Sequence, residues 1–157
     1  MEHIVGIGDI AIANRPHDVI KTYALASCVA VTAYCPITRT AGMVHIALPD
    51  STKYSLYNPE HPCYYANIAV PMLIQKMCME YGCRKENLQI ELFGGAGSAR
   101  KNDYFQIGAR NVQMVTMILN SSGIRFQAVE IGGENSRTLE FTVATGQKKV
   151  YLQPLII

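Results

Sequence analysis

The sequence predicts an α/β domain of mixed strand order, rich in strands and with two main helices. Short segments of alternating or β-branched apolar residues recur along the chain and are typical of strands, whereas two longer segments place apolar residues on one helical face. A chain of 157 residues, of which 49% are hydrophobic, is long enough to bury about two-thirds of its unfolded surface. Because internal repeats and low-complexity segments are absent, residues 1–157 are expected to form a single domain.

The first predicted elements are an opening strand and a hairpin. Apolar residues alternate weakly over residues 3–13, which indicates a strand. Residues 27–31 and 43–47 are rich in valine and other strand-forming residues. Residues 35–40 between them predict a chain reversal, because Pro36 has the fixed φ that turns use. The two apolar segments are therefore predicted to pair.

The hairpin places a cysteine near a histidine. Pairing of Cys35 with Thr40 would set its register. In that register Cys28 faces Ala47, and His45 lies diagonal to Cys28 on the same face of the sheet. Diagonal neighbours lie roughly 7–8 Å apart at Cα, within reach of an imidazole that leans toward a thiol. A register shifted by one residue would place the two side chains on opposite faces.

A long loop follows the histidine strand. Residues 49–64 contain three prolines and little periodicity, and loops of this length in a compact domain are usually lids or binding surfaces. In one interpretation Tyr54, Tyr57 and Tyr64 line a substrate groove, and in the other they cover the domain's own apolar edge, because tyrosine suits both settings.

The middle of the chain predicts a helix, a strand and a glycine-rich turn. The helix covers residues 66–81 and ends at Gly82, and Pro71 is expected to delay its start or to bend it. Residues 88–93 alternate cleanly and indicate a strand that enters the turn 94–98. Because this turn lacks the spacing of a nucleotide-binding loop, we expect a tight turn whose backbone can approach a ligand closely.

The last third of the chain predicts a second helix and three strands. The helix covers residues 109–120 and ends near Gly123, with its apolar residues at helical spacing. Residues 124–131 and 137–144 indicate two strands joined by a glycine-containing turn, and a terminal strand is predicted at residues 150–152.

Composition and charge argue against several classes of function. A net charge of +2 without a basic run argues against nucleic-acid binding. No segment approaches the ~18 apolar residues of a membrane span, and the first residues do not resemble a signal peptide, so we expect a cytoplasmic protein without direct membrane insertion. The five cysteines are odd in number and lack paired spacings, so neither a disulfide framework nor a metal site is expected. No cofactor motif is present.

Cysteine and histidine side by side can form a nucleophilic site. Thiolate is the reactive form of cysteine, and a neighbouring imidazole can take the proton of Cys28, lower its pKa and later protonate a leaving group. Thr22, six residues before Cys28, is the nearest polar candidate to orient His45 through its other ring nitrogen. The alternative is that Cys28 and His45 are ordinary core residues, because free cysteines are often buried.

Several motifs follow one another along the chain: Thr22-x5-Cys28-Val29-Ala30-Val31, His45-x2-Leu48-Pro49, Gly94-Gly95-Ala96, Ile107-Gly108-Ala109-Arg110-Asn111, Gly132-Gly133 and Thr145-Gly146. In this order they resemble the CheD family, the chemoreceptor glutamine deamidases of bacterial chemotaxis, over almost the whole chain. The resemblance implies a layered α/β/β sandwich similar to bacterial cysteine-hydrolase toxins.

The resemblance also implies a protein-glutamine deamidase that converts glutamines of methyl-accepting chemoreceptors to glutamate through a cysteine thioester. The implied nucleophile, base and orienting residue are Cys28, His45 and Thr22, and the residues expected at the substrate are Ser27, Gly94 and Gly95. The same thioester route would allow hydrolysis of glutamyl methyl esters. The implied partners are the cytoplasmic helices of the receptors and a CheC-type phosphatase.

One departure and two alternatives accompany this interpretation. Family members often carry glycines where this chain has Ala24 and Ala26, and alanine would be strained there if the loop needs a positive φ. A non-catalytic regulator of a CheC-type phosphatase is the first alternative, but it would not need the intact set of Cys28, His45 and Thr22. The second alternative is another cysteine hydrolase, such as a peptidase or an acyltransferase.

A polar loop before the second predicted helix ends in two adjacent aromatic residues. Tyr104 and Phe105 either anchor the loop on the core, or divide the roles so that one ring packs and the other is an exposed partner contact. In the second case the exposed ring, together with Arg100 or Lys101, would dock receptor helices or the phosphatase.

Overall fold

The computed structural model describes residues 1–53, 58–97 and 105–155. The strands and helices within these ranges are β1 Glu2–Ile4, β2 Ile10–Ala13, β3 Val19–Leu25, β4 Val29–Cys35, β5 Thr40–Ile46, α1 Ala66–Met79, β6 Gln89–Gly94, α2 Ile107–Ser121, β7 Phe126–Ile131, β8 Asn135–Thr142 and β9 Lys148–Pro154, with short 3-10 helices at Ser51–Lys53 and Lys85–Asn87. None of the helices within the described ranges has the length and apolar character that a membrane crossing requires.

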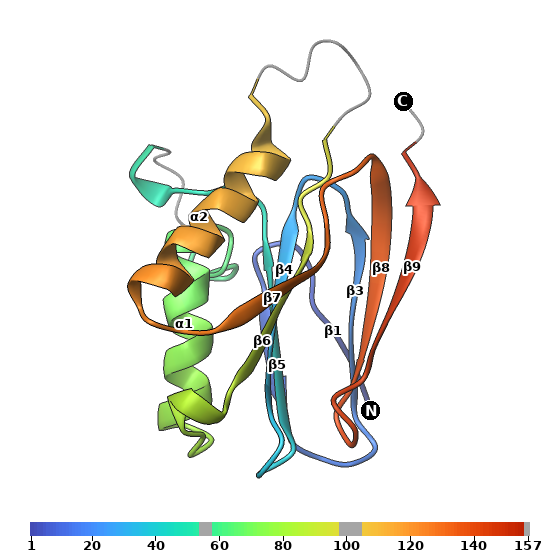
Figure 1. The fold of residues 1–157 in the computed structure, drawn as a ribbon. Coiled ribbons are helices and arrows are strands. Elements are labelled where there is room, and N and C mark those ends of the chain that lie inside the picture. The colour runs from blue at the N-terminus through green and yellow to red at the C-terminus, as the bar shows by residue number, and fades with distance from the viewer. Residues whose placement is uncertain (54–57, 98–104, 156–157) are drawn as a thin grey trace.

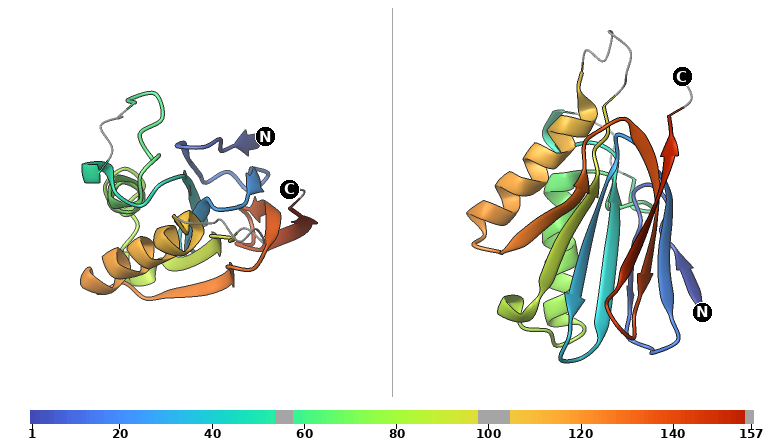
Figure 2. Two further views of the ribbon diagram at one scale, coloured as in Figure 1. Left: turned by 90° about the horizontal axis from the view of Figure 1, so that it is seen from above. Right: turned by 45° about the vertical axis from the view of Figure 1, so that its right-hand side comes forward.

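The elements form three layers (Figure 1). A five-stranded sheet of order β2-β5-β4-β6-β7 lies in the middle, and a four-stranded sheet of order β1-β3-β8-β9 lies on one side of it. Figure 2 shows α1 and α2 on the opposite side of the five-stranded sheet. One apolar core therefore lies between the helices and the middle sheet, and a second lies between the two sheets. This arrangement confirms the expected α/β/β sandwich.

The predicted hairpin forms the centre of the molecule. Every residue of β4 and β5 is buried, because the helices cover one face of these strands and the four-stranded sheet covers the other. Val29 and Val31 point toward the helices, whereas Ala30 points into the core between the sheets. The sheet-facing and helix-facing positions alternate along the strand, as the pleat of a strand requires.

The opening strand was predicted wrongly. Residues 3–13 form two strands in different sheets, because β1 pairs with β3 in parallel and β2 pairs with β5 in antiparallel orientation. A turn at Gly6 to Asp9, with Gly8 at a φ of +84°, interrupts the run. Strand β3 was not predicted at all, because one of its inward positions is the polar Thr22 and not an apolar residue.

The helix predictions are confirmed with small shifts of their ends. The first helix begins at Ala66 and continues through Pro71, so the proline does not delay its start. It ends before Gly82, which has the left-handed φ of 69° expected of a helix stop. The second begins at Ile107, two residues earlier than predicted, and Gly123 follows it in the left-handed region.

The last three strands exist, but they belong to two sheets. Strand β7 pairs in parallel with β6 and forms an edge of the five-stranded sheet. Strand β8 pairs with β3 and β9 in the other sheet. The glycine-containing turn at Gly132 and Gly133 therefore carries the chain from one sheet to the other, near the ends of β4 and β6.

Candidate active site

The register of the hairpin is the one expected from the sequence. Cys35 pairs with Thr40, and the same register pairs Ala30 with His45. Cys28 immediately precedes β4 and packs beside Ala30 on the core between the two sheets. Thiol and imidazole therefore come from adjacent strands, at the same end and on the same face of the middle sheet.

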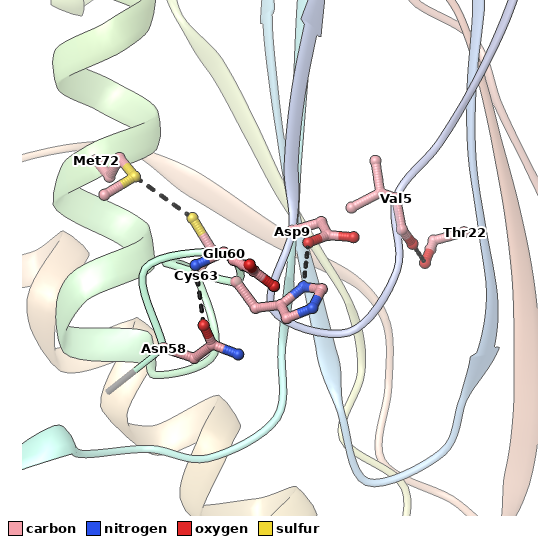
Figure 3. A network of polar contacts seen from close by, with 8 residues as sticks. Val5, Asp9, Thr22, Asn58, Glu60, Cys63 and Met72 are labelled. Atoms are coloured by element: carbon pink, nitrogen blue, oxygen red, sulfur yellow. Dashed lines mark hydrogen bonds and ion pairs between the residues drawn. The ribbon is translucent and has the colours of Figure 1, made fainter. Parts of the chain in front are cut away.

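Thr22 reaches His45 from the opposite sheet. The Oγ1 atom of Thr22 lies 2.7 Å from Nδ1 of His45 and donates its hydrogen to the carbonyl oxygen of Val5 at 2.6 Å. Figure 3 shows the contact between Thr22 and Val5. A hydroxyl group has one hydrogen, and a carbonyl oxygen can only accept, so Thr22 must accept the hydrogen of Nδ1. The unprotonated nitrogen of the neutral ring is therefore Nε2.

The Nε2 atom of His45 is a buried base without a partner. It makes no hydrogen bond within the described part of the chain, although the residue is only 1% exposed. Burial lowers the pKa of His45 to about 4, against smaller opposing effects of Val5 and Asp9. The ring is therefore neutral at pH 7, with a free lone pair on Nε2.

Cys28 is a half-buried thiol in the free protein. Burial raises its pKa to about 11, although its own main-chain N–H contacts the sulfur and opposes the shift. The expectation that His45 lowers this pKa is wrong for the free protein, because a neutral imidazole carries no charge that would stabilise a thiolate. Cys28 and His45 are thus a neutral pair without a hydrogen bond, and such contacts often tighten only when a substrate binds.

Three consecutive carbonyl groups of residues 26–28, the loop that carries Cys28, are held by hydrogen bonds. The carbonyl oxygen of Ala26 accepts from the N–H of Ala96 at 2.7 Å, and that of Cys28 accepts from the N–H of Gly95 at 2.8 Å. The carbonyl oxygen of Ser27, between them, accepts from the side chain of Asn111 at 3.0 Å. The glycine-rich turn and α2 thereby fix the backbone that carries Cys28.

Gly94 and Gly95 lie beneath this loop. Gly94 has a φ of +105°, and a Cβ atom at this position would overlap the carbonyl oxygen of Cys28. Both glycines are buried. The structure thus gives them a role in shaping the loop, whereas contact of Ser27, Gly94 or Gly95 with a substrate stays a prediction.

Ala24 has a positive φ, the conformation in which an alanine is strained at a position where family members often carry glycine. Its φ is 56°, in the left-handed region, within an irregularity of the pairing between β3 and β8 that lies between Thr22 and Leu25. Ala26 is not among the residues with positive φ. One of the two departures from the family pattern therefore strains the backbone of the segment that joins Thr22 to Cys28.

Two buried polar residues near the site were not assigned a role from the sequence. Asn111 was noted only as part of a motif. Arg137 is 2% exposed and donates to the carbonyl oxygen of Gly132 at 2.6 Å, while the N–H of Gly132 donates to Gly94 at 2.9 Å. One sign in the sequence indicates that Arg137 is buried. It lies two residues from the inward-facing Leu139, and alternate residues of a strand share a face.

The other cysteines show no comparable setting. Cys35, Cys63 and Cys83 are buried, and Cys78 is half-buried. Cys63 donates to the sulfur of Met72 at 3.6 Å, a core contact that Figure 3 includes. The described residues contain no cluster of three or more histidine, cysteine, aspartate or glutamate side chains that could hold a metal ion.

The aromatic residues of the two loops are only partly described. Tyr54, Tyr57, Tyr104, Arg100 and Lys101 lie outside the described residues. The ring of Tyr64 packs edge-on against Tyr65 with 5.3 Å between centroids, which fits packing on the domain itself. Phe105 is 69% exposed, so the core-anchor interpretation is wrong for this ring.

A groove of about 1040 Å³ lies away from this site. It is lined by residues such as Leu88, Gly123 and Phe126. Leu88 precedes the start of β6, whereas Cys28 is held at the other end of the strand, beside Gly94. The groove therefore does not bring a ligand to the thiol.

The fold is similar to that of a solved structure. The crystal structure of Bacillus licheniformis hypothetical protein YfiH matches with a TM-score of 0.50 and 13% sequence identity, over 79% of this chain and 51% of that chain. The chain thus spans about half of that protein, and the similarity concerns the fold alone.

Relatives named "Probable chemoreceptor glutamine deamidase CheD" match nearly the whole chain. The protein of Syntrophotalea carbinolica is 41% identical over 145 residues, which cover 91% of this chain and 89% of the relative. That of Desulforamulus reducens is 38% identical over 91% of this chain and 86% of the relative. That of Thermococcus kodakarensis is 36% identical over 96% of this chain and 92% of the relative.

Residues 47–151 match the family described as "CheD chemotactic sensory transduction". The match covers more than half of the chain, although it begins just after His45 and so leaves out Thr22 and Cys28. The relatives, by contrast, align with nine-tenths or more of the chain. On both grounds the chain belongs to the CheD family of chemotactic sensory transduction.

Proposed function

We propose that this protein is a glutamine deamidase of chemoreceptors, with Cys28 as nucleophile, His45 as general base and Thr22 as the residue that orients His45. The observation that carries the proposal is the Thr22 hydrogen bond, which leaves the lone pair of Nε2 free on the strand next to the one that Cys28 precedes, and on the same face of the sheet. The names of the relatives supply the substrate class.

In the first step, His45 accepts the Cys28 proton at Nε2 while the sulfur attacks the carboxamide carbon of a substrate glutamine. The raised pKa of Cys28 and the lowered pKa of His45 both disfavour a free ion pair. Proton transfer should therefore accompany attack instead of preceding it. The tetrahedral oxyanion needs a donor, and the main-chain N–H of Cys28, which contacts its own sulfur, can contribute about 3 kcal/mol.

In the second step, the imidazolium of His45 returns its proton to the departing nitrogen, and ammonia leaves behind a glutamyl thioester on Cys28. Water, activated by the same Nε2, then attacks the thioester and releases glutamate and the thiol. With a glutamyl methyl ester the leaving group is methanol, so the same residues would also serve as a methylesterase.

The proposed substrates are the cytoplasmic helices of methyl-accepting chemoreceptors, and a CheC-type phosphatase is the proposed regulatory partner. This assignment places the protein in the cytoplasm. The exposed ring of Phe105 supports a partner surface next to α2. Arg100 or Lys101 is proposed to complete it, and Tyr104, as the other ring of the pair, is proposed to pack the loop on the domain.

Two other functions would use the same fold. A non-catalytic regulator of the phosphatase would not need the hydrogen bond from His45 to Thr22, and this contact argues against it. Another cysteine hydrolase, such as a peptidase, would use the same thiol and imidazole with a different acyl donor.

A mass measurement distinguishes these functions. Receptor fragments incubated with the protein should gain about one mass unit per glutamine converted, and Cys28→Ala should fold but convert none. Cleavage of the fragment backbone would identify a peptidase. Conversion that persists in Cys28→Ala would contradict the proposed nucleophile, and binding of receptor or phosphatase without any conversion would support the regulator.

A further inference from the structure

One side chain joins the strand ends that carry the thiol and the imidazole. Asn111 is the fifth residue of α2, and it is fully buried. Its Nδ2 group donates to the carbonyl oxygen of Ser27 at 3.0 Å and to that of Ala47 at 3.1 Å. Because carbonyl oxygens only accept, two such neighbours fix the orientation of the amide. Ser27 precedes the nucleophile directly, and Ala47 follows His45 by two residues.

The hydrogen bond to Ser27 determines where the next N–H points. The carbonyl group of Ser27 and the N–H group of Cys28 belong to one peptide unit, and the described chain contains no cis peptide bond. In a planar trans peptide these two groups point in opposite directions. Asn111 draws the carbonyl toward α2, so the N–H of Cys28 points toward the core between the sheets.

From this geometry we propose that Asn111 is a positioning residue, which aims the main-chain N–H of Cys28 at the oxyanion of the tetrahedral intermediate. The inference rests on the proposed function for the reaction that it serves. Gly108 permits the arrangement, because a Cβ atom at this position of α2 would overlap the carbonyl oxygen of Ala96. The Oδ1 atom of Asn111 is buried without a hydrogen-bond partner among the described residues. The amide therefore contributes to this site through its N–H donors and not through its oxygen.

Two reactions of the same thiol test the proposal without any receptor. Iodoacetamide alkylates Cys28 at a saturated carbon, and no oxyanion forms. Acylation by p-nitrophenyl acetate passes through a tetrahedral oxyanion at the same sulfur. Both rates are measured after subtraction of the rate of Cys28→Ala. Asn111→Ala should slow acylation by about tenfold or more while alkylation changes by less than about twofold, because only acylation uses the oxyanion donor.

The matched control is Asn67→Ala. Asn67 is also a helical asparagine with two hydrogen bonds, but both go to Ser51 and neither reaches the loop that carries Cys28. This variant should leave both rates unchanged. If Asn111→Ala does not fold, Asn111→Leu, which keeps most of the side-chain volume but has no donor, should show the same selective loss of acylation.

Unchanged acylation in the folded Asn111 variant would overturn the proposal, and so would a parallel loss of both reactions, which indicates a loop that is merely disordered. The proposed function fails by a separate result, namely that the wild-type protein converts no receptor glutamine. Because the two small reagents report on Cys28 directly, either conclusion can be reached without the other.

Discussion

A single hydroxyl group decides which nitrogen of His45 can act as a base. Thr22 donates its one hydroxyl hydrogen to the carbonyl oxygen of Val5, so its oxygen accepts the hydrogen of Nδ1 of His45. A threonine without this second partner could donate to Nδ1 instead, and the free lone pair would then be lost from Nε2. The carbonyl oxygen of Val5 is therefore as much a part of the arrangement as the side chain that it holds.

Thr22→Val should lower turnover by about 10- to 100-fold, because the valine keeps the shape but leaves Nδ1 of His45 without an acceptor. His45→Ala should lose all turnover, since no base remains. The check is the deamidation rate, with melting temperature measured in parallel, and Thr22→Ser is the control that keeps the hydroxyl. A Thr22→Val protein that melts normally but is as inactive as His45→Ala would give Thr22 a direct chemical role.

At the scale of elements, the loop between β3 and β4 is held in an unusual shape from two sides. On one side Ala24 takes a left-handed conformation within the irregular pairing of β3. On the other side the glycine-rich turn after β6 packs against the carbonyl group of Cys28 without an intervening side chain. These two features lead to opposite expectations for glycine and alanine substitutions.

Ala24→Gly should stabilise the protein by about 0.5–1 kcal/mol, because glycine adopts the observed φ of 56° without the strain that a Cβ atom brings. Ala26→Gly is the matched control two residues away. Its backbone is not in the left-handed region, so glycine there should only add freedom to the unfolded chain and lower stability. Urea unfolding gives the free energy of unfolding of both variants. Equal changes of the same sign would show that Ala24 is not strained.

Gly94→Ala should reduce both activity and stability strongly, because its methyl group would overlap the carbonyl oxygen of Cys28. Gly123→Ala separates the two causes. Gly123 has a φ of +66° with nothing near its Cβ position, so alanine there should cost about 1–2 kcal/mol of stability through φ alone and leave turnover unchanged. If Gly94→Ala is no worse than this control in melting temperature and turnover, the close packing under Cys28 has no consequence.

At the scale of the whole molecule, the candidate active site depends on contacts between sheets that no local pattern contains. The turn residues and the apolar runs were sufficient to predict the hairpin and both helices, whereas the register that pairs Cys35 with Thr40 was only one that they allowed. The division of residues 3–13 between two sheets could not be predicted, because a weak alternation does not reveal which partner each half pairs with. The role of Asn111 depends on contacts 84 and 64 residues away along the chain.

The two sheets are joined by polar contacts at several points along their interface. Near the site, Thr22 meets His45 across the sheets. Further along, the hydroxyl of Tyr34 donates to the carbonyl oxygen of Val143 at 2.9 Å. Lys148 pairs with Glu91 in a largely buried ion pair. The packing of whole sheets therefore sets the position of His45 relative to Thr22 and buries the imidazole. Because burial disfavours the charged ring, protonation of His45 should affect the folding equilibrium as well as catalysis.

This coupling predicts how stability depends on pH. Burial holds the pKa of His45 at about 4 in the folded protein, below its ordinary value of 6.5. Above pH 6.5 the ring is neutral in both states, and the folded state keeps its full stability. As the pH falls from 6.5 toward 4, the unfolded chain binds a proton at His45 that the folded protein does not bind, and up to about 3 kcal/mol of the free energy of unfolding is lost.

Urea unfolding at pH 7, 6 and 5 should show this decline in the wild-type protein and a flatter one in His45→Gln. His17→Gln, at an exposed histidine, should retain the wild-type slope, and a wild-type slope in His45→Gln would mean that His45 is not buried as a neutral base.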